Sequence, residues 1–243
     1  HRASRATVYD RYLYRDSDPF AAASPTPELE VLLRPLFTTS FLLAADLAEH
    51  RYHDADAVLF TSAGSRTALG TAHVISGRTH RPAVVGLTRA EFERDVAALG
   101  VYDRVLTYDE VSSLPVGDTT IVDLAGDGSL TAALHGHLGA SVLHSTIVGA
   151  THWAAEPVDL SSLPGAQRTF FFAPETAQRL RARVGDARLE ATLVAEWRAF
   201  AELMAGWLRI HTDRGSDAVL AAYEAILSGV ASPRDGFVLS LRG

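Results

Sequence analysis

The chain has 243 residues, of which 47% are hydrophobic, and its formal net charge at pH 7 is -7. An acidic chain with scattered arginines lacks the basic stripe that a nucleic-acid surface needs, so we expect no nucleic-acid partner. Cysteine and lysine are both absent, which excludes thiolate nucleophiles, disulfides, Schiff-base chemistry, Walker A loops and the Tyr-x-x-x-Lys pair of short-chain dehydrogenases.

The first 55 residues are predicted to form an arm followed by helices. Residues 1–27 are polar, aromatic and interrupted by prolines, and Tyr9 and Tyr12 could line a substrate cleft or pack on a neighbouring domain. Apolar periodicity then predicts two helices, Glu28–Leu36 and Thr38–His50, with Pro35 ending the first. No uninterrupted apolar run reaches the roughly 18–20 residues that span a bilayer, and no signal-peptide pattern is present, so we expect a cytoplasmic protein without a membrane partner.

From residue 56 to residue 173, short runs rich in Val, Ile and Leu alternate with helical patterns. This alternation predicts an α/β fold, a doubly wound parallel sheet of the Rossmann type with helices on both faces. The expected strands are residues 57–62, 83–87, 103–108, 119–125, 141–149 and 169–174, and the expected helices between them are Thr67–Ser76, Arg89–Leu99 and Ser129–Leu138.

Residues 174–243 are predicted to add helices and one returning strand. The expected helices are Glu175–Val184, Asp186–Ile210 and Asp217–Ser228, and the expected strand is Phe237–Leu241. Apolar side chains recur at helical spacing in the second of these helices, which is typical of a core or an interdomain surface. This stripe consists of Trp197, Phe200, Met204, Trp207 and Leu208.

A run of small residues follows the first strand of the predicted sheet, and it is the strongest functional signal. In a dinucleotide-binding unit the loop at this point faces a pyrophosphate, because small residues let backbone N–H groups approach phosphate oxygens at a helix N-terminus. The expected contacts are Ser62, Ala63, Gly64, Ser65, Arg66 and Thr67. The run departs from the strict G-x-G-x-x-G pattern, and a tight strand-to-helix turn with a solvated Arg66 is the alternative.

The end of the second strand distinguishes between the two nicotinamide cofactors. NAD sites place Asp or Glu there, whereas the 2′-phosphate of NADP favours hydroxyl and arginine partners. The strand ends in Thr88 and Arg89, which favours NADP(H) as the cofactor. The alternative is that Arg89 opens the next helix and pairs with Glu91 or Glu93.

Several segments in this order resemble the medium-chain dehydrogenase/reductase superfamily, on its zinc-free quinone and enoyl reductase side. They are VLFTSAGSRTALGTA, ALGVYDRVLTYDEV, TTIVDLAGDGSLTAALHGHLGASVLHSTIVG and AYEAILSGVASPRDGFVLSL, which together cover most of residues 56–243. VYDRYL, LLRPLFTTSFL and VGATHW are similar to an uncharacterised branch of that superfamily. Relatives also have an N-terminal catalytic domain resembling the chaperonin GroES, to which nothing in this chain corresponds.

The resemblance implies roles for further residues. Asp123, Ala125 and Gly126 fall on the loop that passes the adenosine side of the cofactor. Val148, Gly149, Phe171 and Phe172 fall on the positions that flank the nicotinamide. In relatives the strand matching Thr169–Ala173 pairs with its twin, so we expect a homodimer. The zinc ligands of the superfamily lie largely in the catalytic domain, and we expect no metal site.

Histidines are the remaining candidates for chemistry. His152 follows the predicted nicotinamide loop and could donate a proton to substrate, with Trp153 beside it as a substrate contact; packing against Trp153 is the alternative. We expect His135 and His137 to be solvated or to cap a helix, because no completing ligand set accompanies them. The absence of a Gly-x-Ser-x-Gly elbow weakens a hydrolase interpretation.

The sequence therefore favours an NADPH-dependent reductase that transfers hydride to an activated C=C or a quinone-like carbonyl compound. A non-catalytic protein of the same fold, binding a nucleotide or a protein partner, is the alternative, since a fold does not establish a function.

Overall fold

The computed structural model describes residues 14–149, 160 and 162–242. Within this part of the chain, the centre is a parallel six-stranded sheet in the order β3-β2-β1-β4-β5-β6. Its strands are β1 (Ala57–Phe60), β2 (Ala83–Thr88), β3 (Arg104–Thr107), β4 (Thr119–Asp123), β5 (Val142–Ile147) and β6 (Arg168–Phe170). The order runs outward from β1 in both directions, which confirms the predicted doubly wound sheet.

The helices between these strands are α3 (Arg66–Ser76), α4 (Glu93–Ala97) and α5 (Gly128–Leu138). The helix expected over Arg89–Leu99 is shorter than predicted, because a 3₁₀ turn, Ala90–Phe92, replaces its first residues. Neither Arg89 nor Phe92 caps the following turn with its side chain; instead, the amide of Phe92 donates to the carbonyl of Arg89 at 3.0 Å and the amide of Glu93 donates to the carbonyl of Ala90. A second 3₁₀ segment, Tyr108–Ser113, follows β3.

The N-terminal helices differ from the prediction. Short α1 (Pro19–Ala22) is followed by one continuous helix, α2 (Pro27–Glu49), which runs through Pro35 instead of ending there. Proline leaves the carbonyl of residue 31 without its backbone donor, and Val31 is exposed, so water can satisfy that carbonyl. Packing of the helix on both sides of Pro35 therefore outweighs the break.

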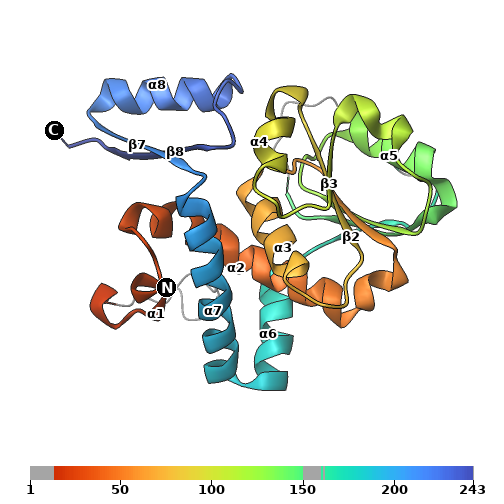
Figure 1. Cartoon of the computed structure of the whole chain (residues 1–243), viewed down its shortest axis with the longest axis horizontal. Coiled ribbons are helices and arrows are strands. Elements are labelled where there is room, and N and C mark those ends of the chain that lie inside the picture. Colours follow the sequence, from red (N-terminus) through yellow and green to blue (C-terminus); the bar gives the residue numbers. More distant parts are fainter. Residues whose placement is uncertain (1–13, 150–159, 161, 243) are drawn as a thin grey trace, which may run out of the picture.

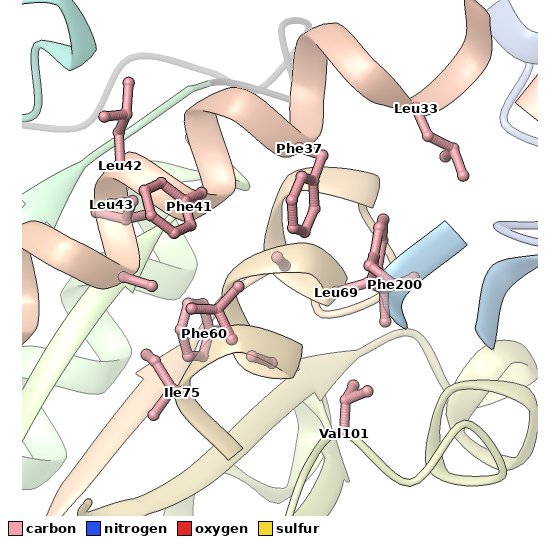
Figure 2. Close-up of a cluster of buried hydrophobic side chains, with 14 of the residues drawn as sticks. Leu33, Phe37, Phe41, Leu42, Leu43, Phe60, Leu69, Ile75, Val101 and Phe200 are labelled. Atoms are coloured by element: carbon pink, nitrogen blue, oxygen red, sulfur yellow. The ribbon is translucent and has the colours of Figure 1, made fainter. Parts of the chain in front are cut away.

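Helix α2 packs against α3, α6 (Ala173–Val184) and α7 (Asp186–Ala205) to form the larger core. Phe37 lies 4.9 Å from Phe200 in a stacked arrangement and 5.6 Å from Trp197, ring centroid to ring centroid. Figure 2 shows Phe37 and Phe200 facing the same cluster as Leu69 of α3. The apolar stripe predicted on the long helix is confirmed as core, because its members are 0–8% exposed.

By length and composition, α2 is also long and apolar enough to cross a membrane, with a mean hydropathy of 1.5 over its best 18-residue window. A core helix passes the same test. The contacts of α2 with α3, α6 and α7 give it the surroundings of a core helix.

One close approach between α2 and α3 sets the position of α3. A Cβ on Gly70 would lie 2.6 Å from the Ser40 hydroxyl, so only glycine fits at that point. The Ser40 hydroxyl donates to the carbonyl of Thr67, at 2.9 Å, and to the carbonyl of Leu36, at 3.0 Å. The first turn of α3 is thereby fixed against the central helix.

The C-terminal part contains a strand that the sequence did not predict. Helix α7 ends at Ala205 rather than at Ile210, and β7 (Arg209–Arg214) pairs in parallel with β8 (Asp235–Ser240). Helix α8 (Ser216–Leu227) connects the two strands, and the three elements lie together at one end of the molecule, apart from the six-stranded sheet (Figure 1). Two-stranded sheets are marginal alone, and Leu32 of α2 supports this one, because a Cβ on Gly236 would lie 2.7 Å from its side chain.

Three histidine rings stack where α2 meets β5. The ring centroids of His53 and His144 lie 3.7 Å apart with an interplanar angle of 10°, and His50 stacks on His53 at 5.4 Å. His53 belongs to a left-handed turn, Arg51–Asp54, in which all four residues have φ between 52° and 59°. Burial and the neighbouring His53 lower the pKa of His144 to about 4, so its imidazole stays neutral in the folded protein.

This stack predicts a loss of stability in acid. An unfolded histidine titrates near pH 6.5, so the unfolded chain binds protons that folded His144 refuses until about pH 4, and the free energy of unfolding falls across that interval. We expect His144→Phe, which keeps a ring in the stack, to remove up to about 2 kcal/mol of this loss in urea titrations at a series of pH values. The same change at exposed His80 is the control; equal pH profiles for the wild type and His144→Phe would refute the prediction.

Candidate functional site

A cavity of about 660 Å³ opens at the carboxyl ends of β1 and β2. One wall comes from the loop after β1, the end of β2 and the start of the segment after β3; the other comes from α2, α8 and the start of β8. The cavity brings together Ser62, Gly64, Ser65, Arg66, Thr67, Thr88 and Arg89, all of which the sequence predicted for one site.

The loop after β1 turns sharply toward α3. Ser62 has a φ of 51°, in the left-handed region, and its carbonyl accepts a hydrogen bond from the amide of Ser65 at 2.8 Å. Ser65 then caps α3, because its hydroxyl accepts from the amide of Ala68 at 3.4 Å. The first two residues of α3, Arg66 and Thr67, line the cavity, and amides at these positions have no partner inside a helix.

The loop lies close against β2, and the sequence allows this only through small residues. The Ala63 amide donates to the carbonyl of Leu87 at 2.9 Å, and its carbonyl accepts from the buried phenol of Tyr102 at 2.9 Å. A Cβ on Gly86 would lie 2.8 Å from the Cβ of Ala63 and 3.1 Å from the Tyr102 ring. The loop is thus held rigidly before any ligand arrives.

Arg66 is the dominant charge of the cavity. It is the first residue of α3, so its guanidinium lies at the positive end of the helix dipole, where a cation is disfavoured. Burial lowers the pKa of the Arg66 guanidinium below its ordinary value, with Asp235 partly opposing that change. Its Nη2 donates to the carbonyl of Asp235 at 2.6 Å, but its buried Nε has no hydrogen-bond partner among the described residues. This arrangement favours an incoming anion.

Arg89 projects into the same cavity from the end of β2. Its Nη2 donates to the carbonyl of Gly229 at 3.0 Å, and its guanidinium lies 4.4 Å from the centroid of the Phe92 ring. Nη1 is 3.2 Å from Glu91 Oε1, so the pairing considered as an alternative is present. Thr88 lines the cavity beside Arg89 and is 4% exposed.

Sequence reasoning missed several residues of this cavity. Tyr108 follows β3, and burial raises the pKa of its phenol, partly offset by hydrogen bonding to Ser62. The motif at the end of the third strand could have revealed Tyr108, since strand ends in this sheet all meet at one edge. The other missed wall consists of Leu32, Leu36, Ile226, Leu227, Gly229, Ala231, Ser232, Pro233, Asp235 and Phe237. No local signal marks these residues.

Asp123 requires a correction, because its carboxylate faces other protein groups rather than a ligand. It is 1% exposed; Oδ1 accepts from the Thr61 hydroxyl at 2.9 Å and from the amide of Gly126, and Oδ2 pairs with Arg168. The Thr61 hydroxyl also accepts the amides of Leu124 and Ala125, each at 2.9 Å. Asp123 therefore shapes the loop after β4 instead of contacting a cofactor.

The other predicted contacts fall into two groups. Ala125, Gly126, Val148 and Gly149 lie after β4 and β5, at the carboxyl edge of the sheet where they were expected, with Ala125 fully buried. Phe171 corrects the prediction, because its ring belongs to the main core, whereas Phe172 is 57% exposed. Tyr9, Tyr12, His152 and Trp153 lie outside the described residues.

His135 also differs from the expectation of a solvated or capping ring. It is fully buried, with Nδ1 2.8 Å from the carbonyl of Pro164 and Nε2 3.1 Å from the Ser145 hydroxyl. His137 contacts the carbonyl of Leu114 at 2.8 Å. Among the residues that the structure describes, no group of three or more His, Asp or Glu side chains is arranged to hold a metal ion.

With this geometry established, the chain can be compared with known proteins. The profile of a family described as "Protein of unknown function (DUF2855)" matches residues 1–232. The chain belongs to this family. A comparison with curated proteins finds none that matches it.

Solved structures share the fold at low sequence identity. YhdH from E. coli K-12, solved with bound NADPH, is 16% identical with a TM-score of 0.52, over 85% of this chain and 61% of YhdH. The yhdH oxidoreductase from Salmonella enterica, in complex with NADP, is 19% identical with a TM-score of 0.54, over 83% and 60%. CurA from Vibrio vulnificus, in complex with NADPH, is 13% identical with a TM-score of 0.50, over 85% and 62%.

These likenesses show that the chain shares its fold with YhdH, the yhdH oxidoreductase and CurA, as the resemblance in sequence implied. The DUF2855 chain spans about three fifths of the length of these three structures. The bound cofactors are properties of those three proteins.

The Thr61 hydroxyl gives a testable prediction about the loop after β4. Thr61→Val keeps the shape of the side chain but removes the acceptor of the Leu124 and Ala125 amides and one of the two donors to Asp123 Oδ1, so we expect the free energy of unfolding to fall by about 2–3 kcal/mol. Urea unfolding measures this loss. Thr192→Val, at an exposed threonine of α7 whose hydroxyl donates to the carbonyl of Arg188, is the matched control and should change stability by less than about 0.5 kcal/mol.

Proposed function

We propose that this DUF2855 protein is an NADPH-dependent reductase. The single observation that carries the proposal is the cavity that is lined by Arg66, at the start of α3, by Arg89, directly after β2, and by the small residues of the loop after β1. A dinucleotide presents negative charge at two such points, the pyrophosphate and the 2′-phosphate. The NADPH- and NADP-bound structures of similar fold support the choice of cofactor.

The residues present fit this cofactor. The loop from Ser62 to Thr67 would hold the pyrophosphate with its hydroxyls and with those of its amides that are not bonded to Leu87 or Ser62, and the guanidinium of Arg66 would donate to a phosphate oxygen. Thr88 and Arg89 would hold the 2′-phosphate. The end of β2 carries no carboxylate of the kind that bonds two ribose hydroxyls in NAD sites.

The loop after β4, with Ala125 and Gly126, would pass the adenosine side of the cofactor. The reacting end would lie along the loop after β5, where Val148 and Gly149 would flank the nicotinamide, with Phe172 near them, and would orient it while excluding water from one face. The bound cofactor supplies the hydride. His152 is proposed to hold a proton for the substrate, and Trp153, Tyr9 and Tyr12 to contact it.

For the substrate we propose an activated C=C or a quinone-like carbonyl compound. Such substrates need an electrophilic carbon beside the hydride donor and charge stabilisation on an oxygen, but no metal. The likeness of the fold to zinc-free reductases supports this class. The activity is proposed to take place in the cytoplasm.

Two arginine variants distinguish the contribution of the pyrophosphate to cofactor affinity from that of the 2′-phosphate. We expect Arg66→Gln to weaken NADPH and NADH alike, by about tenfold or more, because both carry the pyrophosphate. Arg89→Gln should weaken NADPH by about tenfold or more and leave NADH within about twofold, because only NADPH carries a 2′-phosphate. Isothermal titration calorimetry with each cofactor measures these four affinities.

The result for Arg89→Gln and the result for the wild type test different parts of the proposal. Equal losses of NADPH and NADH in Arg89→Gln would reject the 2′-phosphate assignment, and no binding by the wild type would reject the proposal as a whole. Oxidation of bound NADPH in the presence of enones and quinones tests catalysis. Binding without oxidation across such a panel would favour the non-catalytic alternative.

We also propose a homodimer formed through β6. This strand pairs with β5 and otherwise lies at an edge of the described sheet, and Phe170 on it is 68% exposed. An exposed aromatic edge is suited to pairing with a second strand.

We expect analytical ultracentrifugation to show twice the mass of the chain for the wild type and a single chain for Phe170→Asp. Leu220→Asp, at an exposed site on α8, is the control and should stay dimeric. A wild type that sediments as a single chain would contradict the dimer.

A further inference from the structure

The segment between α8 and β8 crosses the mouth of the cavity. We name residues 228–235 the strap. Gly229, Ala231, Ser232, Pro233 and Asp235 of the strap line the cavity. Pro233 lies directly on the phosphate loop, since a Cβ on Gly64 would be 3.0 Å from its side chain.

The strap holds both arginines of the cavity through backbone carbonyls. The carbonyl of Asp235 accepts from Arg66 Nη2 at 2.6 Å, and that of Gly229 accepts from Arg89 Nη2 at 3.0 Å. A carbonyl is neutral, so it fixes the direction of a guanidinium without cancelling its charge. Arg66 Nε is buried and has no hydrogen-bond partner among the described residues.

The carboxylate of Asp235 is occupied elsewhere. Its Oδ1 lies 3.1 Å from Arg209 Nη2 and 3.0 Å from His211 Nε2, both on β7, and its Oδ2 accepts from the amide of Ser232 at 3.0 Å. These contacts lower the pKa of the Asp235 carboxyl, against the effect of its burial, and keep it ionised on β7. Asp235 thus binds Arg66 through its backbone carbonyl, while the Asp235 carboxylate pairs with Arg209 and His211 of β7.

One side chain of the strap anchors it to the six-stranded domain. Arg234 Nε donates to the carbonyl of Trp207 at 3.0 Å, and its Nη1 lies 3.4 Å from Asp95 Oδ1 on α4. The Trp207 indole donates in turn to the carbonyl of Asp95 at 3.0 Å. Arg234 does not line the cavity, so any effect it has on a ligand there passes through the strap.

We propose that the strap is the positioning element of the phosphate site and that Arg234 is its positioning residue. The strap presents two arginines that are already oriented, so less conformational freedom is lost when the phosphates bind. This inference rests on the proposed function, because it concerns the two phosphates of NADPH.

The test removes the anchor while leaving both arginines in place. We expect Arg234→Gln to weaken NADPH and adenosine 2′,5′-bisphosphate by roughly fivefold to tenfold in calorimetry, because both arginines lose their orientation. Arg188→Gln, at an exposed arginine on α7, is the matched control and should bind as the wild type does. Thermal melts of each variant identify any loss of folding.

A purely structural role is distinguished by combining substitutions. In a chain that already carries Arg66→Gln and Arg89→Gln, Arg234→Gln should cause no further loss of affinity, because it acts through those two side chains. An equal loss in both backgrounds would overturn the proposal, as would unchanged affinity in the single Arg234→Gln variant. Absence of binding to the wild type would instead refute the proposed function.

Gly229→Ala gives an independent measurement should Arg234→Gln fail to fold. Gly229 has a φ of 73°, so an alanine there strains the backbone whose carbonyl accepts from Arg89, with its Cβ 3.4 Å from Arg89 Nη1, whereas Arg66 is held by Asp235, six residues away. We expect NADPH to weaken several-fold more than NADH. Equal losses of the two cofactors would contradict the strap contact with Arg89.

Discussion

The structure depends on a positive charge held where a helix disfavours it. Arg66 opens α3 at the positive end of the helix dipole, and its guanidinium has one buried nitrogen without a partner among the described residues. Both features are unfavourable for a cation, and under the proposed function the pyrophosphate would offset them. This charge lies beside three other features of the cavity: the loop after β1, Arg89 after β2, and the strap.

Interior packing behind the cavity wall maintains that arrangement. Helix α2 crosses the core through Pro35 and fixes the first turn of α3 through the Ser40 hydroxyl and Gly70. At the ends of the neighbouring strands β1 and β4, Thr61 and Asp123 join the loop after β4 to the end of β1 by hydrogen bonds. The carboxyl edge of the sheet, where a dinucleotide would bind, is therefore held in place by buried hydrogen bonds and packing. Its residues can change conformation only slightly when a ligand binds.

The site could be predicted from sequence where the signal was local. Small residues after a strand, followed by a helix, predict a loop that lines the cavity, and the residues at the end of β2 predict its neighbour, because both predictions depend on strand order alone. Asp123 shows the limit of such reasoning. A carboxylate at a strand end is equally suited to a ligand or to a buried network, and only the positions of Thr61 and Arg168 decide between them. His135 is a second such case, since two partners from other segments bury its ring.

The sequence by itself determined the parallel sheet, the order of its elements and the apolar stripe of α7, because period and residue type are properties of short segments. Only the tertiary structure decided that α2 continues through Pro35, that residues 209–214 form a strand, and that the strap closes over the cavity. The hydrogen bonds that join the strap to Arg89 and Arg66 connect residues 140 and 169 positions apart. No pattern within a segment encodes such contacts, since they exist only when the whole core has brought the two ends of the chain together.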